Sequence, residues 1–345
     1  MDFRSDNVTG ASAPVIAALQ RLAVGALSPY GNDDLTRAVE KRLEDLFECP
    51  LKAYLVATGS AANALALSVL CPPYGALYCH PDAHIATDEC GAPEFYTGGA
   101  KLVTIPGDHG KITAAGLEAA LAKGWQGVVH HVQPAAVSLT QASEAGTVYK
   151  PREIAAIARV ARRHGLALHM DGARFANALV GLGCTPAEAT WKAGVDVLSF
   201  GGTKNGCLAV EAVLFFQPER ARDFEFRRKR GGHLFSKMRF LAAQMQAYLE
   251  DDLWLENARH ANRLARRLAA GLKAIPGIRR RHQVEANEVF LDLPGRLAKA
   301  LAREGFIMEL WAKGEPMQVR LVTAFSTKDE EVDAFLAAAR RLQRA

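Results

Sequence analysis

Lys204 and Asp171 are the two residues whose types and positions most directly suggest chemistry. Lys204 lies in the glycine-rich turn Gly201-Gly202-Thr203-Lys204-Asn205-Gly206, which follows an apolar run, and Asp171 ends an earlier apolar run. A lysine amine can form a Schiff base with an aldehyde, and a carboxylate can keep a pyridine nitrogen protonated. The pair therefore suits pyridoxal phosphate (PLP), whose protonated ring accepts electrons from a substrate. Either residue alone is a weaker signal, because Asp171 could cap a helix and Lys204 could occupy an ordinary turn.

The segment Val56-Ala57-Thr58-Gly59-Ser60-Ala61-Ala62-Asn63 has the composition of a phosphate-binding turn. It runs from a predicted strand through a glycine into a predicted helix, where free backbone N–H groups and the positive end of the helix dipole meet. Gly59 and Ser60 are the candidate phosphate ligands. No Gly-Lys-Ser/Thr follows, which argues against a nucleotide-binding P-loop. The alternative is that Ser60 only caps the helix.

His84 and Arg320 are further candidates because each lies in or beside a predicted strand. His84 follows the strand predicted at residues 76–79, and its imidazole could stack on a flat heteroaromatic ring or be a structural loop histidine. Arg320 lies within the apolar strand Val319-Arg320-Leu321-Val322, where an arginine is costly unless it is paired. It could bind a substrate carboxylate through two parallel hydrogen bonds, or it could form a structural ion pair.

The middle of the chain alternates between strand-like and helix-like segments. Strands are predicted at residues 54–58, 76–79, 127–132 and 166–170 and in a run ending at Phe200, and helices at residues 60–70 and 152–164. Nearly all-apolar strands that alternate with helices indicate a parallel sheet covered on both faces. Because ligands bind beyond the carboxyl ends of such strands, Asp171, Lys204 and His84 are expected at one edge of the sheet.

The pattern changes after about Gly232. A long helical region is predicted at residues 238–273, followed by strands at 288–293 and 317–324 with a helix at 297–303 between them. Thr327 and Glu330 are expected to form a capping box at the start of the last helix. The sequence therefore predicts a smaller α+β domain that follows a larger α/β domain.

Composition and charge exclude several classes of protein. The 345 residues are 49% hydrophobic and carry a net charge of +5, which is too mild to indicate a nucleic-acid-binding protein. The uncharged stretch at residues 53–79 is interrupted by polar residues and prolines, so no membrane span is expected. The six cysteines lack a CxxC pair and are expected to be reduced thiols in the cytoplasm. Pro81 disrupts the spacing of Cys79, His80 and His84, so no metal site is predicted.

Together these residues resemble the PLP-dependent threonine aldolases, which belong to the fold type I (aspartate aminotransferase-like) superfamily. The matching motifs are Arg4-Ser5-Asp6-Asn7-Val8-Thr9, Tyr30-Gly31-Asn32-Asp33, Thr58-Gly59-Ser60-Ala61-Ala62-Asn63, His84, Asp171-Gly172-Ala173-Arg174, Lys204, Arg228-Lys229-Arg230-Gly231-Gly232 and Val319-Arg320-Leu321-Val322-Thr323. The resemblance covers essentially the whole chain and implies an α/β fold. The expected parts are an N-terminal arm at residues 1–30, a large PLP-binding domain at 31–237 with a mostly parallel seven-stranded sheet, and a small C-terminal α+β domain at 238–345.

The resemblance also implies roles for the residues around the cofactor. Lys204 would form the Schiff base, and Asp171 would pair with the pyridine nitrogen. His84 would stack on the ring and assist near the substrate hydroxyl. Gly59 and Ser60 would bind the phosphate.

A further set of residues is implied to bind the substrate or to act across a subunit interface. Ser5, Arg174 and Arg320 would bind the substrate carboxylate, and Arg174 would also contact the cofactor. The resemblance implies a homotetramer built from dimers, with active sites at the dimer interface. Tyr30 is expected to reach the neighbouring subunit's site, and one or more of Lys229, Arg230 and Lys237 is expected to contact its cofactor phosphate. This implied contact with a neighbouring phosphate outweighs the simpler interpretation of the basic residues 227–230 as a solvated helix face.

The implied activity is retro-aldol cleavage of a β-hydroxy-α-amino acid, such as threonine, allo-threonine or a phenylserine, to glycine and an aldehyde. A β-eliminating lyase or an aminotransferase on the same fold is one alternative, and a non-catalytic PLP-binding protein is another. One departure concerns a histidine that many family members carry in a segment resembling Glu-Asn-Thr-His. The matching residues 139–147 contain no histidine, and His130 and His131 are candidate substitutes. The base for the substrate hydroxyl, and with it the preference between threo and erythro isomers, stays open.

Overall fold

The computed structural model describes residues 1–124, 126–312 and 314–344. Residues 125, 313 and 345, which fall inside the predicted domains, lie outside this description. The larger part of the molecule is built around a seven-stranded sheet with the order β1-β7-β6-β5-β4-β2-β3. Its strands are β1 (Lys52–Val56), β2 (Gly75–Cys79), β3 (Lys101–Thr104), β4 (Gln133–Thr140), β5 (Ala167–Gly172), β6 (Val197–Gly201) and β7 (Glu211–Phe215).

The predicted mostly parallel seven-stranded sheet is confirmed. β7 runs antiparallel to both of its neighbours, β1 and β6. The other neighbouring pairs, from β6 through β5, β4 and β2 to β3, are parallel. Every residue of β2, β5, β6 and β7 is buried, as expected for strands that are covered on both faces.

The strand predicted at residues 127–132 is wrong. These residues form turns, and the strand begins at Gln133. Val128 and Val129 suggested a strand, but they lie on the surface, where Val129 is 92% exposed. Gly127 has φ +77°, and the Gln133 side chain accepts its N–H at 2.7 Å, which closes a loop rather than a ladder. Pro134 and the small residues after it hid the true strand from the sequence pattern.

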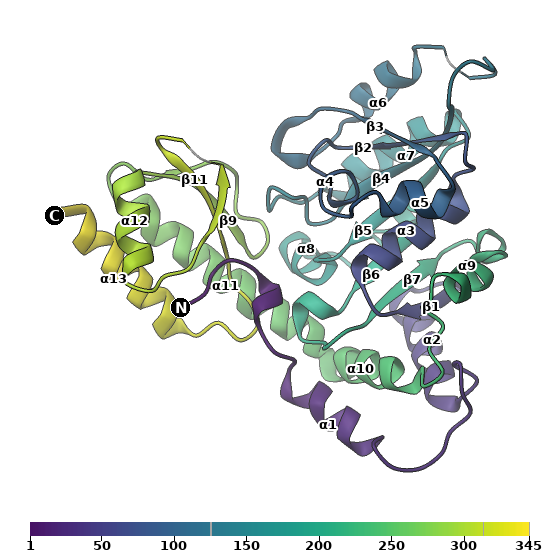
Figure 1. Cartoon of the computed structure of the whole chain (residues 1–345), viewed down its shortest axis with the longest axis horizontal. Coiled ribbons are helices and arrows are strands. Elements are labelled where there is room, and N and C mark those ends of the chain that lie inside the picture. Colours follow the sequence, from purple (N-terminus) through teal and green to yellow (C-terminus); the bar gives the residue numbers. More distant parts are fainter. Residues whose placement is uncertain (125, 313, 345) are drawn as a thin grey trace.

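Helices surround the sheet (Figure 1). They are α1 (Ala13–Arg21), α2 (Asp34–Phe47), α3 (Gly59–Leu70), α4 (His84–Thr87), α5 (Ala92–Thr97), α6 (Ala114–Leu121), α7 (Pro151–Arg163), α8 (Phe175–Leu182) and α9 (Phe224–Arg230). α3 is the helix that matters most for the site, because it contacts β4, β5, β6 and β7 in turn. It begins where Thr58 accepts the N–H of Ala61, and its alanine- and leucine-rich sequence is almost entirely buried.

The predicted helical region at residues 238–273 is divided into α10 (Arg239–Leu249) and α11 (Leu253–Lys273). The break occurs at Asp251 and Asp252, which both adopt positive φ. α10 packs against α1 and α2 beside the large sheet, whereas α11 reaches from α8 to the small sheet (Figure 1). α11 therefore connects the two parts of the molecule.

The C-terminal part is an α+β unit with a four-stranded antiparallel sheet in the order β10-β11-β9-β8. Its elements are β8 (Arg279–Arg280), β9 (Glu288–Leu293), α12 (Gly295–Arg303), β10 (Glu309–Ala312), β11 (Met317–Val322) and α13 (Asp329–Arg344). The N-terminal segment joins this unit, because the Phe3 backbone N–H donates to Ile307 and its carbonyl accepts from Val322.

The predicted capping box at Thr327 and Glu330 is wrong in its partners. The Glu331 carboxylate, not that of Glu330, accepts the Lys328 N–H at 2.8 Å, and the Thr327 hydroxyl accepts the N–H of Ala324. The cap therefore lies one residue later than the sequence pattern indicates.

Two further observations concern the predicted absence of a membrane span and the state of the cysteines. Within residues 1–124, 126–312 and 314–344, no helix is both long and apolar enough to cross a membrane. All six cysteines are free thiols, as expected.

Candidate active site

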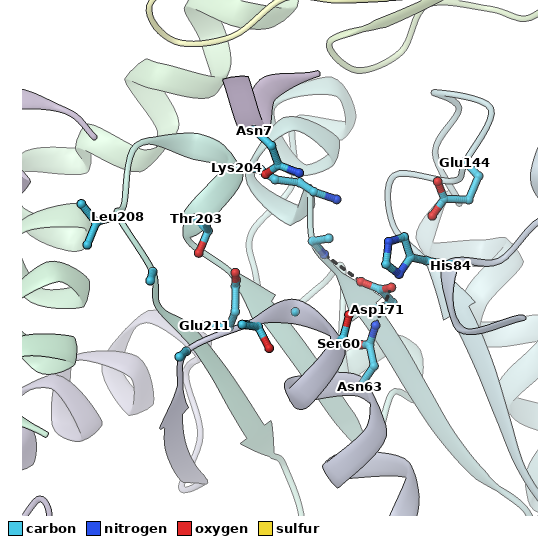
Figure 2. A pocket seen from close by; sticks show the side chains of 15 residues that line it. Asn7, Ser60, Asn63, His84, Glu144, Asp171, Thr203, Lys204, Leu208 and Glu211 are labelled. Carbon is cyan, nitrogen blue, oxygen red and sulfur yellow. Dashed lines mark hydrogen bonds between the residues drawn. The ribbon is translucent and has the colours of Figure 1, made fainter. Parts of the chain in front are cut away.

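A cavity of about 450 Å³ opens at the carboxyl ends of β5 and β6. Its walls come from the ends of these strands, the N-terminus of α3, the His84 segment and the loop that carries Glu144 (Figure 2). Asn7 of the N-terminal turn and the segment from Leu208 to Glu211 complete the lining. Lys204, Asp171, His84, Gly59 and Ser60 all line it. The structure thus brings together five residues that the sequence predicts to bind the cofactor. Lys204 is predicted to bind its aldehyde carbon, Asp171 and His84 its ring, and Gly59 and Ser60 its phosphate.

Asp171 is held at the end of β5 by two hydrogen bonds. Its Oδ1 accepts the Ala173 N–H at 3.0 Å, and its Oδ2 accepts the Asn63 side-chain amide at 2.8 Å. The next helix, α8, begins only at Phe175, so the interpretation of Asp171 as a helix cap is wrong. Asn63 stands one turn into α3, and its contact fixes the Asp171 carboxylate relative to the phosphate-binding turn.

Lys204 lies in a short 3₁₀ turn at residues Thr203–Asn205, directly after β6. Asn205 anchors this turn, because its side-chain amide donates to the Tyr248 hydroxyl and to the Trp254 carbonyl, both at 2.8 Å. On the other side, the Gly202 N–H donates to the buried Glu211 carboxylate at 2.8 Å. The backbone is therefore rigid on both sides of Lys204, while the structure gives its amine no hydrogen bond or ion pair with any described residue.

The N-terminus of α3 offers unpaired donors to the same cavity. Gly59 and Ser60 occupy the first two helical positions, where no carbonyl of the helix can accept their N–H groups. The capping side chain is Thr58, which accepts the Ala61 N–H at 3.2 Å, so the interpretation of Ser60 as the cap is wrong. Two N–H groups, the Ser60 hydroxyl and the helix dipole converge on a spot suited to an anion.

His84 is joined to Asp171 through two further side chains. Its Nδ1 lies 2.9 Å from Glu89 Oε1, and the same oxygen accepts the Asn63 amide at 2.9 Å. Asn63 therefore bridges Glu89 and Asp171. The hydrogen bond to Glu89 raises the pKa of His84, whereas burial raises the pKa of Glu89.

We predict that Glu89→Gln lowers the pKa of His84. Glutamine keeps an oxygen that can accept from Asn63 and His84, but it removes the charge that favours the imidazolium. The pKa of His84 is raised in the folded state, so its pairing with Glu89 stabilises the protein at pH values below the unfolded-state pKa of 6.5. This stabilisation is lost as the pH rises through the folded-state pKa. The variant should therefore lose stability mainly at low pH.

The measurement is an NMR titration of the His84 ring, together with urea unfolding at several pH values. Asp88→Asn is the matched control, because the neighbouring Asp88 side chain accepts from Thr87 at the surface. An unchanged His84 pKa in Glu89→Gln would show that this carboxylate does not control the imidazole.

Two other buried or partly buried carboxyl groups line the cavity, Glu144 and Glu211. Burial raises the pKa of each to about 7. Glu211 has a structural partner in the Gly202 N–H. Glu144 has no hydrogen bond or ion pair with any residue in the described ranges, and Figure 2 shows its carboxylate pointing into the cavity on the side of His84.

The three predicted carboxylate-binding residues lie outside the cavity lining. Arg174 is buried and makes a two-pronged ion pair with Asp6, with distances of 2.8 and 3.0 Å. Arg320 donates to the Arg4 carbonyl at 3.1 Å and lies 3.8 Å from Glu288, which Arg174 also approaches at 3.3 Å. The hydroxyl of Ser5 accepts the Asn7 N–H at 3.1 Å.

The charges in this cluster are balanced. Burial alone would raise the pKa of Asp6, but the Arg174 guanidinium and the Lys204 amine hold it below its ordinary value. Glu288 is thus an available partner if Arg320 forms a structural ion pair. The predicted role of Ser5, Arg174 and Arg320 in binding a substrate stays a prediction.

Tyr30, Lys229 and Lys237, expected to act on a neighbouring subunit, are exposed residues that do not line the cavity of their own chain. The Lys229 amine lies 5.1 Å from the centre of the Tyr30 ring, so two of the three are neighbours. His130 and His131 lie in the exposed turns before β4, away from the cavity lining. The structure therefore does not place them in the active-site cavity of their own chain.

The residues present fit pyridoxal phosphate. A lysine amine without a partner can form a covalent bond to an aldehyde, and an anion site stands at the start of α3. The Asp171 carboxylate lines the same cavity, and two donors hold it at the carboxyl edge of the sheet. An amine, a fixed carboxylate and an anion site are the three features that this cofactor needs.

Comparisons with known proteins agree with this site. The family described as "Beta-eliminating lyase" matches residues 2–294. A low specificity L-threonine aldolase of Pseudomonas aeruginosa is 46% identical over 304 residues, which cover 88% of this chain and 87% of the relative. A second low specificity L-threonine aldolase, from Pseudomonas sp. strain NCIMB 10558, is 45% identical over 304 residues. These residues again cover 88% of this chain and 87% of the relative.

Solved structures give the same result for the fold. A threonine aldolase of Leishmania major superposes with a TM-score of 0.93 and 28% identity, covering 99% of both chains. An aspartate aminotransferase of Rhodobacter sphaeroides, at 17% identity, superposes with a TM-score of 0.69 over 100% of this chain and 92% of that one and so shares the fold. The expected fold type I architecture is confirmed. The chain belongs to the beta-eliminating lyase family and, within it, to the low-specificity L-threonine aldolases.

Proposed function

We propose that this protein is a PLP-dependent aldehyde-lyase that cleaves L-threonine and related β-hydroxy-α-amino acids to glycine and an aldehyde. The observation that carries the proposal is the convergence of Lys204, the Asn63-bound Asp171 and the α3 N-terminus on one cavity, in a chain of this family. Pyridoxal phosphate supplies the electron sink that allows the bond between Cα and Cβ to break.

The residues of this chain then bind and orient the reacting groups. Lys204 would hold the cofactor covalently through its amine, and Asp171, fixed by Asn63, would keep a proton on the ring nitrogen. Gly59 and Ser60 would bind the phosphate, and His84 would contact the ring and the substrate hydroxyl.

Ser5, Arg174 and Arg320 are proposed to bind the substrate carboxylate, which would orient the bond to be broken. Support comes from their position, because both guanidinium groups meet at Glu288, beside the N-terminal turn that carries Asn7 into the cavity. A steady-state comparison of Arg320→Leu with the wild type tests this. A raised KM with little change in kcat is the expected result, and an unchanged KM would contradict it.

We further propose a cytoplasmic homotetramer in which Tyr30, Lys229 and Lys237 reach the neighbouring subunit's site. This role is supported because the three side chains are exposed and do not line the cavity of their own chain. Light scattering gives the mass of the holoenzyme in solution, and a monomer with full activity would refute the assembly. The division into residues 1–30, 31–237 and 238–345 is likewise proposed, and limited proteolysis tests it by where the chain is first cut.

A product assay tests the activity itself. The holoenzyme is incubated with threonine, allo-threonine and phenylserine in both L and D series, and glycine and aldehyde are quantified. Equal amounts of glycine and aldehyde from an L substrate are expected. The family description favours one alternative, β-elimination, which would instead yield ammonia and a keto acid.

A further inference from the structure

Glu144 is a carboxyl group in the cavity for which the roles described above give no use. Its side chain points from the loop after β4 into the same space as Lys204, Asp171 and His84 (Figure 2). Glu144 is partly buried and has no hydrogen bond or ion pair with a described residue, so no contact within the fold explains why its carboxylate faces the cavity. Glu144 lies in the segment 139–147 that lacks the expected histidine, but the sequence pattern did not single it out, because glutamates are common in surface loops.

The loop that carries Glu144 is firmly held. On one side, Gln141 and Tyr149 are joined by two hydrogen bonds, from the Gln141 amide to the Tyr149 carbonyl and from the Tyr149 N–H to the Gln141 side chain, both at 2.9 Å. Closer to Glu144, the Ser143 N–H donates to the Thr147 carbonyl at 2.8 Å. A carboxylate on such a support is positioned before a substrate arrives, as a proton acceptor must be.

His84, the other candidate acceptor, is poorly suited to this task. Its Nδ1 is engaged by Glu89 at 2.9 Å, and that contact favours the imidazolium, which has no lone pair to accept a proton. His84 is better suited to donate a hydrogen bond to the oxygen of the substrate.

We propose that Glu144 accepts the proton of the substrate's β-hydroxyl group when the bond between Cα and Cβ breaks. This rests on the proposed function. The O–H electron pair becomes the second carbon–oxygen bond of the aldehyde, and the proton passes to a Glu144 carboxylate oxygen. The electron pair of the broken bond stays at Cα, which later takes up a proton to give glycine. No oxidant or reductant is required.

The electrostatic surroundings suit this role at neutral pH. Burial raises the pKa of Glu144 to about 7, Lys204 and Arg174 act to lower it, and Glu288 and Asp171 act to raise it. A base with a pKa near the working pH is both ionised in part and able to hold a proton. The acidic limb of kcat/KM for threonine should therefore lie near pH 7 and report this carboxyl group.

The test compares two reactions of the Glu144→Gln holoenzyme. Cleavage of L-threonine requires a hydroxyl proton to leave, whereas exchange of the glycine α-proton with deuterium in D₂O does not. Cleavage should fall by roughly 10²- to 10⁴-fold, as for loss of a general base. Glycine exchange and the visible absorbance of bound PLP should stay near the wild-type level.

Glu285→Gln is the matched control, because Glu285 contacts the same loop through the Val148 N–H but does not line the cavity. It should leave both reactions unchanged. Glu144→His, which restores a proton acceptor, should cleave threonine faster than Glu144→Gln, and this comparison holds even if the glutamine variant loses some PLP.

Three outcomes would count against this assignment, and a fourth would count against the proposed function. Wild-type cleavage by Glu144→Gln would overturn the proposal, and so would an equal loss of cleavage and glycine exchange with PLP still bound, since Glu144 would then act at Cα or on the cofactor. A histidine variant no faster than the glutamine variant would also count against it. If the wild type itself forms no aldehyde, the proposed function fails rather than this assignment.

Discussion

Lys204→Ala should abolish turnover almost completely, with kcat for threonine cleavage lower by on the order of 10³-fold or more. In the proposed function, the Lys204 amine is the nucleophile for the cofactor's aldehyde carbon. The turn around Lys204 is fixed by Asn205 and Glu211. Alanine removes the amine without disturbing those anchors. The variant should fold normally and bind PLP only non-covalently, which dialysis against buffer without PLP will reveal.

Lys101→Ala is the control for this experiment. Lys101 is an exposed lysine at the first position of the edge strand β3 and does not line the cavity. It should retain both turnover and bound PLP. If Lys204→Ala kept wild-type turnover, another residue would have to hold the cofactor.

Asp171→Asn should lower kcat/KM by on the order of 10²- to 10³-fold, the effect of removing one partner from a buried charge pair. Asparagine has nearly the same shape, but its single acceptor oxygen can keep the hydrogen bond from Asn63 or from the Ala173 N–H, not both. The larger loss is electronic, because a neutral amide no longer favours a proton on the ring nitrogen. Steady-state kinetics, with the far-ultraviolet circular dichroism as a check on folding, provide the measurement.

Asp196→Asn separates this effect from damage to the sheet. Asp196 is also buried, but it stands at the opposite end of the strands, where its carboxylate accepts the Leu168 N–H at 2.7 Å. The Asp196→Asn variant should be less stable than the wild type, but its kcat/KM per folded molecule should be unchanged. A similar loss of kcat/KM in both variants would mean that Asp171 supports the fold rather than the cofactor.

The parts of the site that the sequence predicts well are those that belong to a single segment. Asp171 and Lys204 each follow an apolar run, so the strand and its functional end can be recognised together. The turn at Gly59 is recognisable for the same reason. Parallel sheet topology then places the ends of these strands on one edge.

The parts that the sequence did not reveal depend on contacts between distant segments. The Asn63 amide reaches Asp171 only because α3 crosses the sheet at β5, and Glu89 reaches His84 through a short loop without helical spacing. Asn63 belongs to the motif that begins at Thr58 and is the one amide side chain in α3, but neither signal shows that it reaches Asp171. The pairing of Arg174 with Asp6 could not be foreseen either, since it requires the N-terminal segment to fold back over the sheet.

The most direct test of the account is the position of the covalent link to PLP. The holoenzyme is reduced with borohydride, digested, and mapped by mass spectrometry for the lysine that carries the pyridoxyl group. The pyridoxyl label is expected on Lys204, beside Asn205 and just after the end of β6. A label on Lys229, Lys237 or any other lysine, or no label on a protein that contains PLP, would contradict it.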